Sequence, residues 1–238
     1  MTSLPQIPLN QLPLITDELA VLAELVPLIE CRIVELGCGN ARLARTLLQC
    51  YPGCEVTGLE VDVRQHAKNL ADPQPHLTFI AAGAQAIPLA DASCDLALML
   101  KSLHHVPLSA MAQALDEIAR VLRPGGYLYV SEPIYDGEMN EVIRLYNDEG
   151  VVRALAQAAL DSALSTGQWE QVTERRFATP VHFKDFADFE QRMMRPTYAD
   201  HQLDDATIAA VRVAFEPHCT ADGADFTRPM LVRLLRRL

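Results

Sequence analysis

The stretch VELGCGNARL, residues 34–43, decides the fold of this chain. An apolar run leads into Glu35, two glycines follow one residue apart at Gly37 and Gly39, and a helix-forming run comes next. A glycine turn between a buried strand and a helix lets the backbone pass close to a bound nucleotide. The stretch therefore predicts a nucleotide-binding turn after the first strand of an α/β sheet.

Strand-like and helix-like runs alternate on both sides of this turn. The expected strands are 31–37, 55–61, 77–82, 95–100 and 127–132, and the expected helices are 16–29, 41–50, 63–70 and 109–121. Alternation with apolar strands predicts a mostly parallel sheet that helices cover on both faces. We expect a single doubly wound α/β domain whose sheet has seven strands.

The alternation loosens after Pro133, and this change suggests the domain organisation. We expect 1–30 to be an N-terminal segment and helix over the active site, and 31–133 to be the nucleotide-binding core. Residues 134–218 are expected to form a helical cap or substrate insertion with a later core strand. Residues 219–238 then supply the C-terminal strand of the core sheet.

The composition limits the partners that the chain can have. Its formal net charge of −11 argues against a nucleic-acid partner, and no apolar run is long enough for a membrane span. The N-terminal segment lacks a basic region and is interrupted by prolines, unlike a signal peptide. Six scattered cysteines indicate buried free thiols and no metal site. We expect a cytoplasmic protein, monomeric or homodimeric, that acts on a small molecule.

Two nucleotide motifs compete for the glycine turn. A dinucleotide fingerprint needs a third glycine, and Arg42 occupies that position. The pattern E-x-G-x-G-x-A instead resembles the first motif of class I S-adenosylmethionine-dependent methyltransferases. The resemblance implies a Rossmann-like fold and S-adenosyl-L-methionine as cofactor, with S-adenosyl-L-homocysteine as product. It implies that Gly37, Cys38 and Gly39 receive the amino-acid part of this donor, and that Glu35 helps to hold its ammonium group.

Glu60, at the end of VTGLE, matches the acid that binds the ribose hydroxyls in this family, and Val61 follows it. Asp62 is the competing carboxylate. We interpret Asp62 as the N-cap of the next helix, because an aspartate directly before a helical run usually accepts a backbone hydrogen bond there.

The run AAGAQAIPLADASCDLALML resembles the family's third-loop region, with one departure. Gly83 stands where an acid normally accepts the adenine amino group. We expect the backbone of Ala84 or Gln85, with apolar packing, to hold the adenine instead. Lys101 and Ser102 leave the fourth strand and should face the methionine end of the donor, whereas residues 122–128 match a turn of mainly architectural role.

The loop after the fourth strand also limits the chemistry. It lacks the box typical of amide and nucleobase-amine methylases and the acidic ligands of metal-dependent relatives, so no metal is expected. His104 and His105 are adjacent, so at most one can face the ligand; His104 is the candidate general base. In the cap, Arg195 is a candidate for holding an acidic group of the acceptor, and Tyr198 is a candidate for a position near the sulfonium of the donor.

An aromatic stripe precedes these two cap residues, at Phe183, Phe186 and Phe189. We interpret it as ordinary helix core, because any packed helix shows spacings of three and four residues. The resemblance favours methyl transfer to a small-molecule acceptor. Two alternatives stay open: an enzyme that consumes the donor by cyclising or transferring its aminobutyrate chain, and a non-catalytic module that senses the donor.

Overall fold

The computed structural model describes residues 8, 11–196 and 201–238. These residues form two compact units, which we describe separately. The sheet unit comprises residues 17–132, 151–174 and 232–238. The aromatic unit comprises the described residues up to 16, with 133–150 and 175–231.

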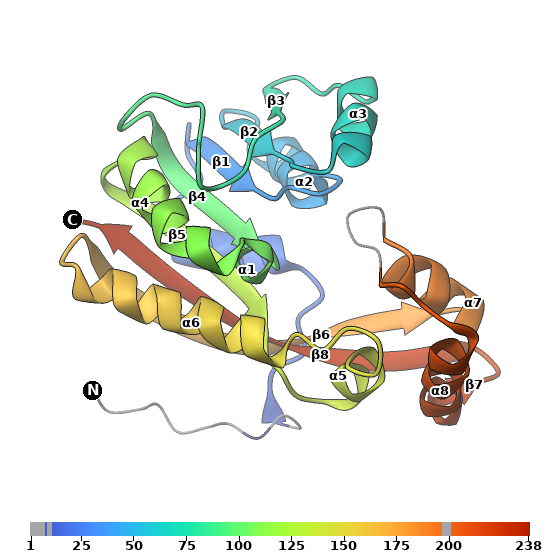
Figure 1. The fold of residues 1–238 in the computed structure, drawn as a ribbon. Helices are drawn as coiled ribbons and strands as arrows, with labels where there is room; N and C mark the ends of the chain where they lie inside the picture. Colours follow the sequence, from blue (N-terminus) through green and yellow to red (C-terminus); the bar gives the residue numbers. More distant parts are fainter. Residues whose placement is uncertain (1–7, 9–10, 197–200) are drawn as a thin grey trace. The chain divides into compact units, whose positions relative to one another are not determined.

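The chain builds a mixed sheet in the strand order β3-β2-β1-β4-β5-β8-β6, with the short β7 paired to β8 (Figure 1). The strands are β1 Arg32–Leu36, β2 Glu55–Leu59, β3 Leu77–Ile80, β4 Cys94–Leu100, β5 Leu122–Pro133, β6 Trp169–Phe183, β7 Cys219–Thr220 and β8 Gly223–Arg237. The pairs β1–β2, β1–β4, β2–β3 and β4–β5 are parallel, and β7–β8 is antiparallel. The expected doubly wound, mostly parallel α/β sheet is confirmed; the two-residue β7 is additional to the seven strands expected.

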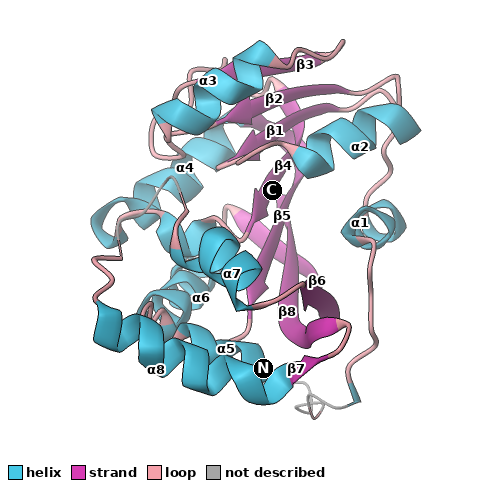
Figure 2. Ribbon diagram, turned by 90° about the vertical axis from the view of Figure 1, so that its right-hand side faces the viewer, coloured by secondary structure: helices cyan, strands magenta, loops and turns pink. Residues whose placement is uncertain are grey.

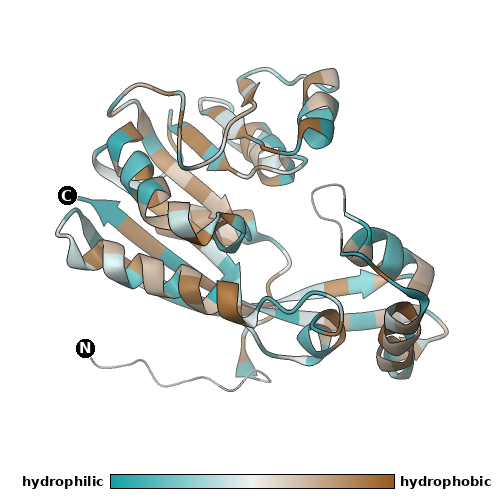
Figure 3. Cartoon of the chain, in the orientation of Figure 1, coloured by the Kyte–Doolittle hydropathy of each residue, from teal (hydrophilic) through white to brown (hydrophobic). Residues whose placement is uncertain are grey.

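Helices cover both faces of the sheet unit. They are α1 Glu18–Leu25, α2 Arg42–Cys50, α3 Val63–Ala71, α4 Met111–Val121 and α6 Gly150–Ser165. In Figure 2, α4 and α6 lie on one face of the sheet, and α1 and α2 lie on the other. Strand residues of one face, such as Val34, Met99 and Val130, join one buried cluster with residues of α4 and α6. Figure 3 shows apolar residues along the strands between these layers, as expected for strands buried on both faces.

A groove of about 530 Å³ runs between α4 and α6. Its lining is mostly apolar and includes Leu115, Ala159 and Trp169, with Asp116 and Ser162 among the polar exceptions. The Trp169 side chain is itself buried there.

The first helix is shorter than the apolar spacing predicted. It ends at Leu25, Val26 is already extended, and Ile29 is 79 % exposed. Pro27 explains the difference, because the residue before a proline is disfavoured in helical conformation. The expectation that all cysteines are buried is also wrong, since Cys50 and Cys219 are exposed free thiols.

The aromatic unit contains α5 Glu138–Ile143, α7 Phe186–Phe189, the π-helical turn η4 Glu190–Met194, α8 Asp205–Phe215 and η5 Glu216–His218. Residues 134–218 contribute to both units, because α6 belongs with the sheet unit apart from its first residue. Phenylalanine rings form the centre of the aromatic unit. The Phe189 ring centroid lies 5.1 Å from that of Phe183 and 4.9 Å from that of Phe215, and all three side chains are fully buried.

None of the helices in the described ranges combines the length and the apolar character that a membrane crossing requires.

Candidate functional site

The glycine turn joins β1 to α2 at the carboxyl edge of the sheet. Gly37 and Gly39 have positive φ angles of 68° and 54°, a region that favours glycine. The amides of Gly37 and Cys38 both donate to the carbonyl oxygen of Leu59, at 2.9 Å. A Cβ on Gly37 would lie 2.9 Å from the Cβ of Ser102, whereas a Cβ on Gly39 would meet nothing within 4 Å. Gly37 thus permits close packing, and Gly39 borders open space of the kind a ligand needs.

Glu60 follows β2 and holds this turn. Its Oε2 accepts a hydrogen bond from the Gly39 amide, and its Oε1 accepts one from the Asp62 amide, both at 2.8 Å. A carboxylate has about four acceptor sites, so each oxygen can accept one more hydrogen bond. The Asp62 side chain accepts from the Arg64 amide as the N-cap of α3. Of the two carboxylates, Glu60 therefore contacts the turn and Asp62 caps a helix.

Two buried polar side chains complete this arrangement, and the sequence analysis identified only one of them, Ser102. The Asn69 side chain on α3 donates to the Gly39 carbonyl at 2.7 Å, and Ser102 donates to the Leu36 carbonyl at 2.7 Å. Ser102 was expected to face the donor; its hydroxyl contacts the strand before the turn. Asparagine is rarely buried, so an asparagine on the inward face of a short helix could have indicated Asn69 as a site residue. We call Gly37, Gly39, Glu60, Asn69 and Ser102 the turn network.

The Cys38 side chain points into the fold. A Cβ on Gly58 would lie 2.9 Å from the Cys38 sulfur. Burial raises the pKa of this thiol, so it stays protonated. Only the backbone of Cys38 is therefore placed to meet a ligand at the turn.

Glu35 lies beneath the turn and is almost fully buried. Burial raises the pKa of its carboxyl group to about 8, with smaller opposing effects from the Lys101 ammonium and the Ala44 amide. Among the described residues, its Oε2 has no hydrogen-bond partner. The Lys101 nitrogen lies 3.7 Å from a carboxylate oxygen of Glu18 on α1. A buried acceptor oxygen with no partner fits the ammonium group expected here.

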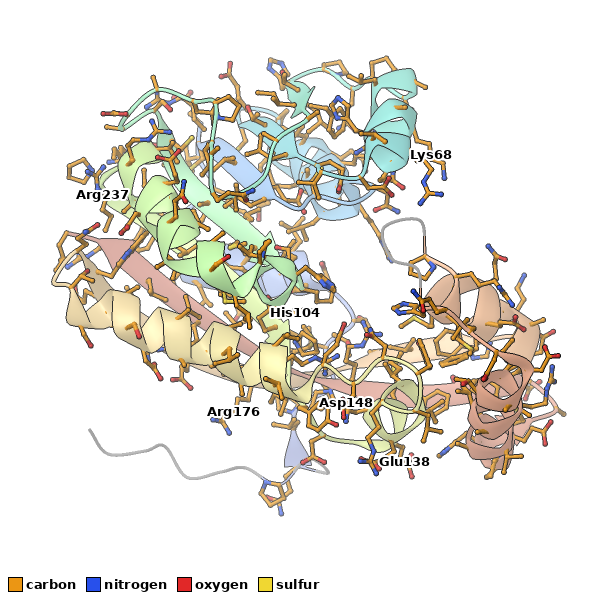
Figure 4. The ribbon with its side chains drawn as sticks, viewed as in Figure 1. Lys68, His104, Glu138, Asp148, Arg176 and Arg237 are labelled. Carbon is orange, nitrogen blue, oxygen red and sulfur yellow. The ribbon has the colours of Figure 1, made fainter. Side chains whose placement is uncertain are left out.

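His104 and Glu132 form a buried pair at the carboxyl ends of β4 and β5. The His104 Nδ1 contacts Glu132 Oε2 directly, while Glu132 Oε1 accepts from the Leu103 amide at 2.8 Å. His104 is buried and His105 is exposed. Figure 4 labels His104 at the short helix η2 Leu103–His105, which follows β4. Glu132 was missed, although an acid at the end of an apolar strand is an unusual signal.

The remaining donor candidates follow β2 and β3. Ala84 is buried in the same cluster as Leu59 and Ile87. Val61, directly after Glu60, is 66 % exposed. A Cβ on Gly83 would lie 2.5 Å from the Oε1 of Gln85, so the Gln85 side chain folds back over this glycine.

The acceptor candidates lie in the aromatic unit or outside the described residues. Arg195 pairs with Glu190 through contacts of 2.7 and 2.9 Å and is exposed. Tyr198 lies outside the described residues. Phe183, Phe186 and Phe189 are buried among one another, so the aromatic stripe is core.

Comparisons with known proteins find similarity in the segment that contains the glycine turn. A family model described as a methyltransferase domain matches residues 34–130. The chain is 31 % identical over 104 residues to the ubiquinone/menaquinone biosynthesis C-methyltransferase UbiE of Syntrophotalea carbinolica, covering 42 % of this chain and 43 % of that protein. It is 32 % identical over 137 residues to the malonyl-[acyl-carrier protein] O-methyltransferase of Enterobacter lignolyticus, covering 56 % and 53 %. The chain thus spans about half the length of these curated relatives.

Solved structures show the same fold. The YcgJ protein of Bacillus subtilis matches with a TM-score of 0.62 at 16 % identity, over 92 % of this chain and 97 % of that one. The [4+2]-cyclase SpnF matches with a TM-score of 0.59 at 19 % identity, over 92 % and 78 %. Residues 34–130, which contain the glycine turn, are thus similar to a methyltransferase domain, and the chain shares the fold of these solved structures.

Proposed function

We propose that this chain transfers a methyl group from S-adenosylmethionine to a small-molecule acceptor. The observation that carries the proposal is Glu60, whose two oxygens bind the amides of Gly39 and Asp62 and can each accept another hydrogen bond. That arrangement suits a pair of ribose hydroxyls beside the glycine turn. The partnerless Glu35 oxygen suits the ammonium group of the same donor.

We assign the donor to residues from four strand ends. They are Glu35 near the end of β1, Gly37, Cys38 and Gly39 after β1, Glu60 and Val61 after β2, Ala84 and Gln85 after β3, and Lys101 and Ser102 after β4. Strand ends of a parallel sheet share one edge, so these positions can serve one extended ligand. Ser102 and Cys38 act through the backbone of the turn and not through direct side-chain contact.

The donor supplies an activated methyl group, so the chain mainly has to align the acceptor and exclude water. Alignment of this kind lowers a barrier by roughly 7–11 kcal/mol. His104 is the proposed base for an acceptor that carries a proton. Glu132 contacts Nδ1, so the pair favours proton transfer at Nε2. Arg195 and Tyr198 remain the proposed acceptor residues.

The function is tested by incubating the purified chain with the donor, first alone and then with a metabolite extract. We expect S-adenosylhomocysteine to form only when the extract is present, with one extract component gaining the mass of a methyl group. Methylthioadenosine from the donor alone would overturn methyl transfer in favour of aminobutyrate chemistry. Donor binding without any turnover in extracts would favour a sensing role.

The base is tested by the pH dependence of the same reaction. His104→Ala should lower turnover most at pH values where the acceptor still carries its proton, while donor affinity changes little. Glu132→Gln should shift the pH profile and retain part of the turnover, because it keeps a hydrogen-bonding group beside the ring. Unchanged pH profiles in both variants would assign this pair to the fold alone.

A further inference from the structure

The loop after β3 departs from the family pattern at Gly83, and a nearby side chain fills the space. A Cβ on Gly83 would lie 2.5 Å from the Oε1, 2.9 Å from the Cδ and 2.9 Å from the Nε2 of Gln85. The whole carboxamide therefore occupies the volume that any side chain at position 83 would need. Glycine at this position is what allows the Gln85 side chain to fold back.

The strand order places the loop that carries this carboxamide where we expect the purine ring of the donor to lie. The strands β1, β2 and β3 are consecutive neighbours in the sheet, about 4.8 Å apart. A donor whose methionyl part lies at the glycine turn after β1, and whose ribose lies on Glu60 after β2, continues towards the loop after β3. Val61 presents an exposed apolar side chain after Glu60, and an apolar surface suits the face of a purine ring.

The backbone of Gln85 is held by a hydrogen bond, whereas its side-chain carboxamide forms none with the described residues. Its backbone carbonyl accepts a hydrogen bond from the Gln113 side chain at 2.8 Å, and the Ala86 amide donates to the Gly83 carbonyl at 3.2 Å. The residue is half-buried. Among the described residues, none forms a hydrogen bond with its carboxamide, so the acceptor oxygen and the donor nitrogen are both able to bind a ligand.

We propose that the Gln85 carboxamide reads the purine base of the donor and accepts a 6-oxopurine as well as adenine. This inference rests on the proposed function. Adenine offers an N6–H donor beside the N1 acceptor, and a carboxamide matches both with one acceptor and one donor. Hypoxanthine offers an N1–H donor beside the O6 acceptor. Rotation of the amide by half a turn exchanges its oxygen and nitrogen and restores both hydrogen bonds.

The alternative is recognition by a backbone amide of Ala84 or Gln85. Such an amide can only donate, so it would bind the adenine N1 and oppose the N1–H of hypoxanthine. The two modes therefore predict different selectivity, and the difference can be measured by binding alone.

The experiment is calorimetry of the full chain with S-adenosylhomocysteine and S-inosylhomocysteine. We expect the wild-type dissociation constants to agree within about fivefold, and Gln85→Leu to weaken both ligands by about tenfold through the loss of two hydrogen bonds. The proposal would be overturned if the wild type preferred the adenine ligand by more than about thirtyfold and Gln85→Leu bound both ligands as the wild type does. Two hydrogen-bond donors that face each other would produce a preference of that size.

A matched pair of variants tests the role of Gly83. Gly83→Ala should displace the carboxamide and weaken both ligands, whereas the same substitution in a Gln85→Ala background should have no further effect. Equal losses in both backgrounds would show a clash with the ligand or the loop and would contradict the assignment.

The binding results distinguish a failure of this inference from a failure of the proposed function. If wild-type protein binds S-adenosylhomocysteine and the Gln85 variants bind it equally well, only the reading of the base is wrong. If wild-type protein binds neither ligand, the donor site itself is wrong and both proposals fall. Circular dichroism of each variant identifies any loss of binding that comes from misfolding.

Discussion

The turn network of the sheet unit and the phenylalanine cluster of the aromatic unit are ordered by different interactions. The turn network consists of polar groups that backbone amides and carbonyls hold at 2.7–2.9 Å. The phenylalanine cluster consists of Phe183, Phe186, Phe189, Phe215 and Phe226, whose neighbouring ring centroids lie 4.9–6.1 Å apart. In the turn network, the Glu60 carboxylate can still accept hydrogen bonds from a ligand. In the phenylalanine cluster, the rings are buried against one another. Substitutions in the first should therefore change ligand binding, and substitutions in the second should change folding.

The largest expected effect is on the phenylalanine cluster. Phe189→Ala should lower the free energy of unfolding by about 3–5 kcal/mol, because a fully buried ring leaves a cavity. Denaturant unfolding measures this loss. Val213→Ala is the matched control, since Val213 is 70 % exposed in the same unit. Loss of donor binding by Phe189→Ala without any change in unfolding would break the comparison.

The next effect is on the turn network. Glu60→Ala should weaken donor binding by about 1.5–3 kcal/mol, through the loss of hydrogen bonds to a charged acceptor. Calorimetry with S-adenosylhomocysteine measures it, and Asp62→Ala is the control for a nearby carboxylate. We expect Asp62→Ala to lower stability by about 1 kcal/mol as a lost N-cap, while the donor still binds. The reverse result would mean that Asp62 is the ribose acid.

A third effect depends on pH and concerns Glu35. The pKa of its carboxyl group is about 8 in the fold against an ordinary value of 4.5, so the folded protein binds the proton more tightly than the unfolded chain. The contribution of Glu35 to stability should then be fully present below pH 4.5 and should be lost as the pH rises towards 8, by up to about 1.4 kcal/mol per pH unit. Unfolding measured over this range should show the decline in the wild type and not in Glu35→Gln. Parallel pH curves for the two proteins would contradict it.

The smallest effect on stability is expected at Arg195. Its ion pair with Glu190 is exposed and should contribute less than about 1 kcal/mol. Arg195→Ala should keep donor affinity within about tenfold, or 1.4 kcal/mol, yet lower turnover more strongly if the residue holds the acceptor. Turnover with the acceptor found in extracts measures this. Wild-type turnover would assign Arg195 to the surface ion pair alone.

Two features of the site could be predicted from the sequence, because they depend on a local motif and on strands that end at the same edge of the sheet. The glycine turn and the proximity of Glu60 to it could be expected, because the carboxyl ends of parallel strands meet at one edge. Asn69, Glu132 and the Glu18–Lys101 contact could not, because their partners lie 28 or more residues away and packing alone selects them. The end of the first helix at Leu25 was missed because the apolar spacing continues past the proline that stops it.

Trp169 has a consequence for experiments on this protein. It is the single tryptophan of the chain, and it is buried in the groove between α4 and α6 of the sheet unit. Its emission spectrum therefore reports on the sheet unit. It does not report on the aromatic unit, which has tyrosines and phenylalanines but no tryptophan. Fluorescence and circular dichroism followed side by side in denaturant become a test of cooperativity. Coincident curves mean that the two units unfold as one, and an emission change that is displaced from the ellipticity change means that one unit unfolds first.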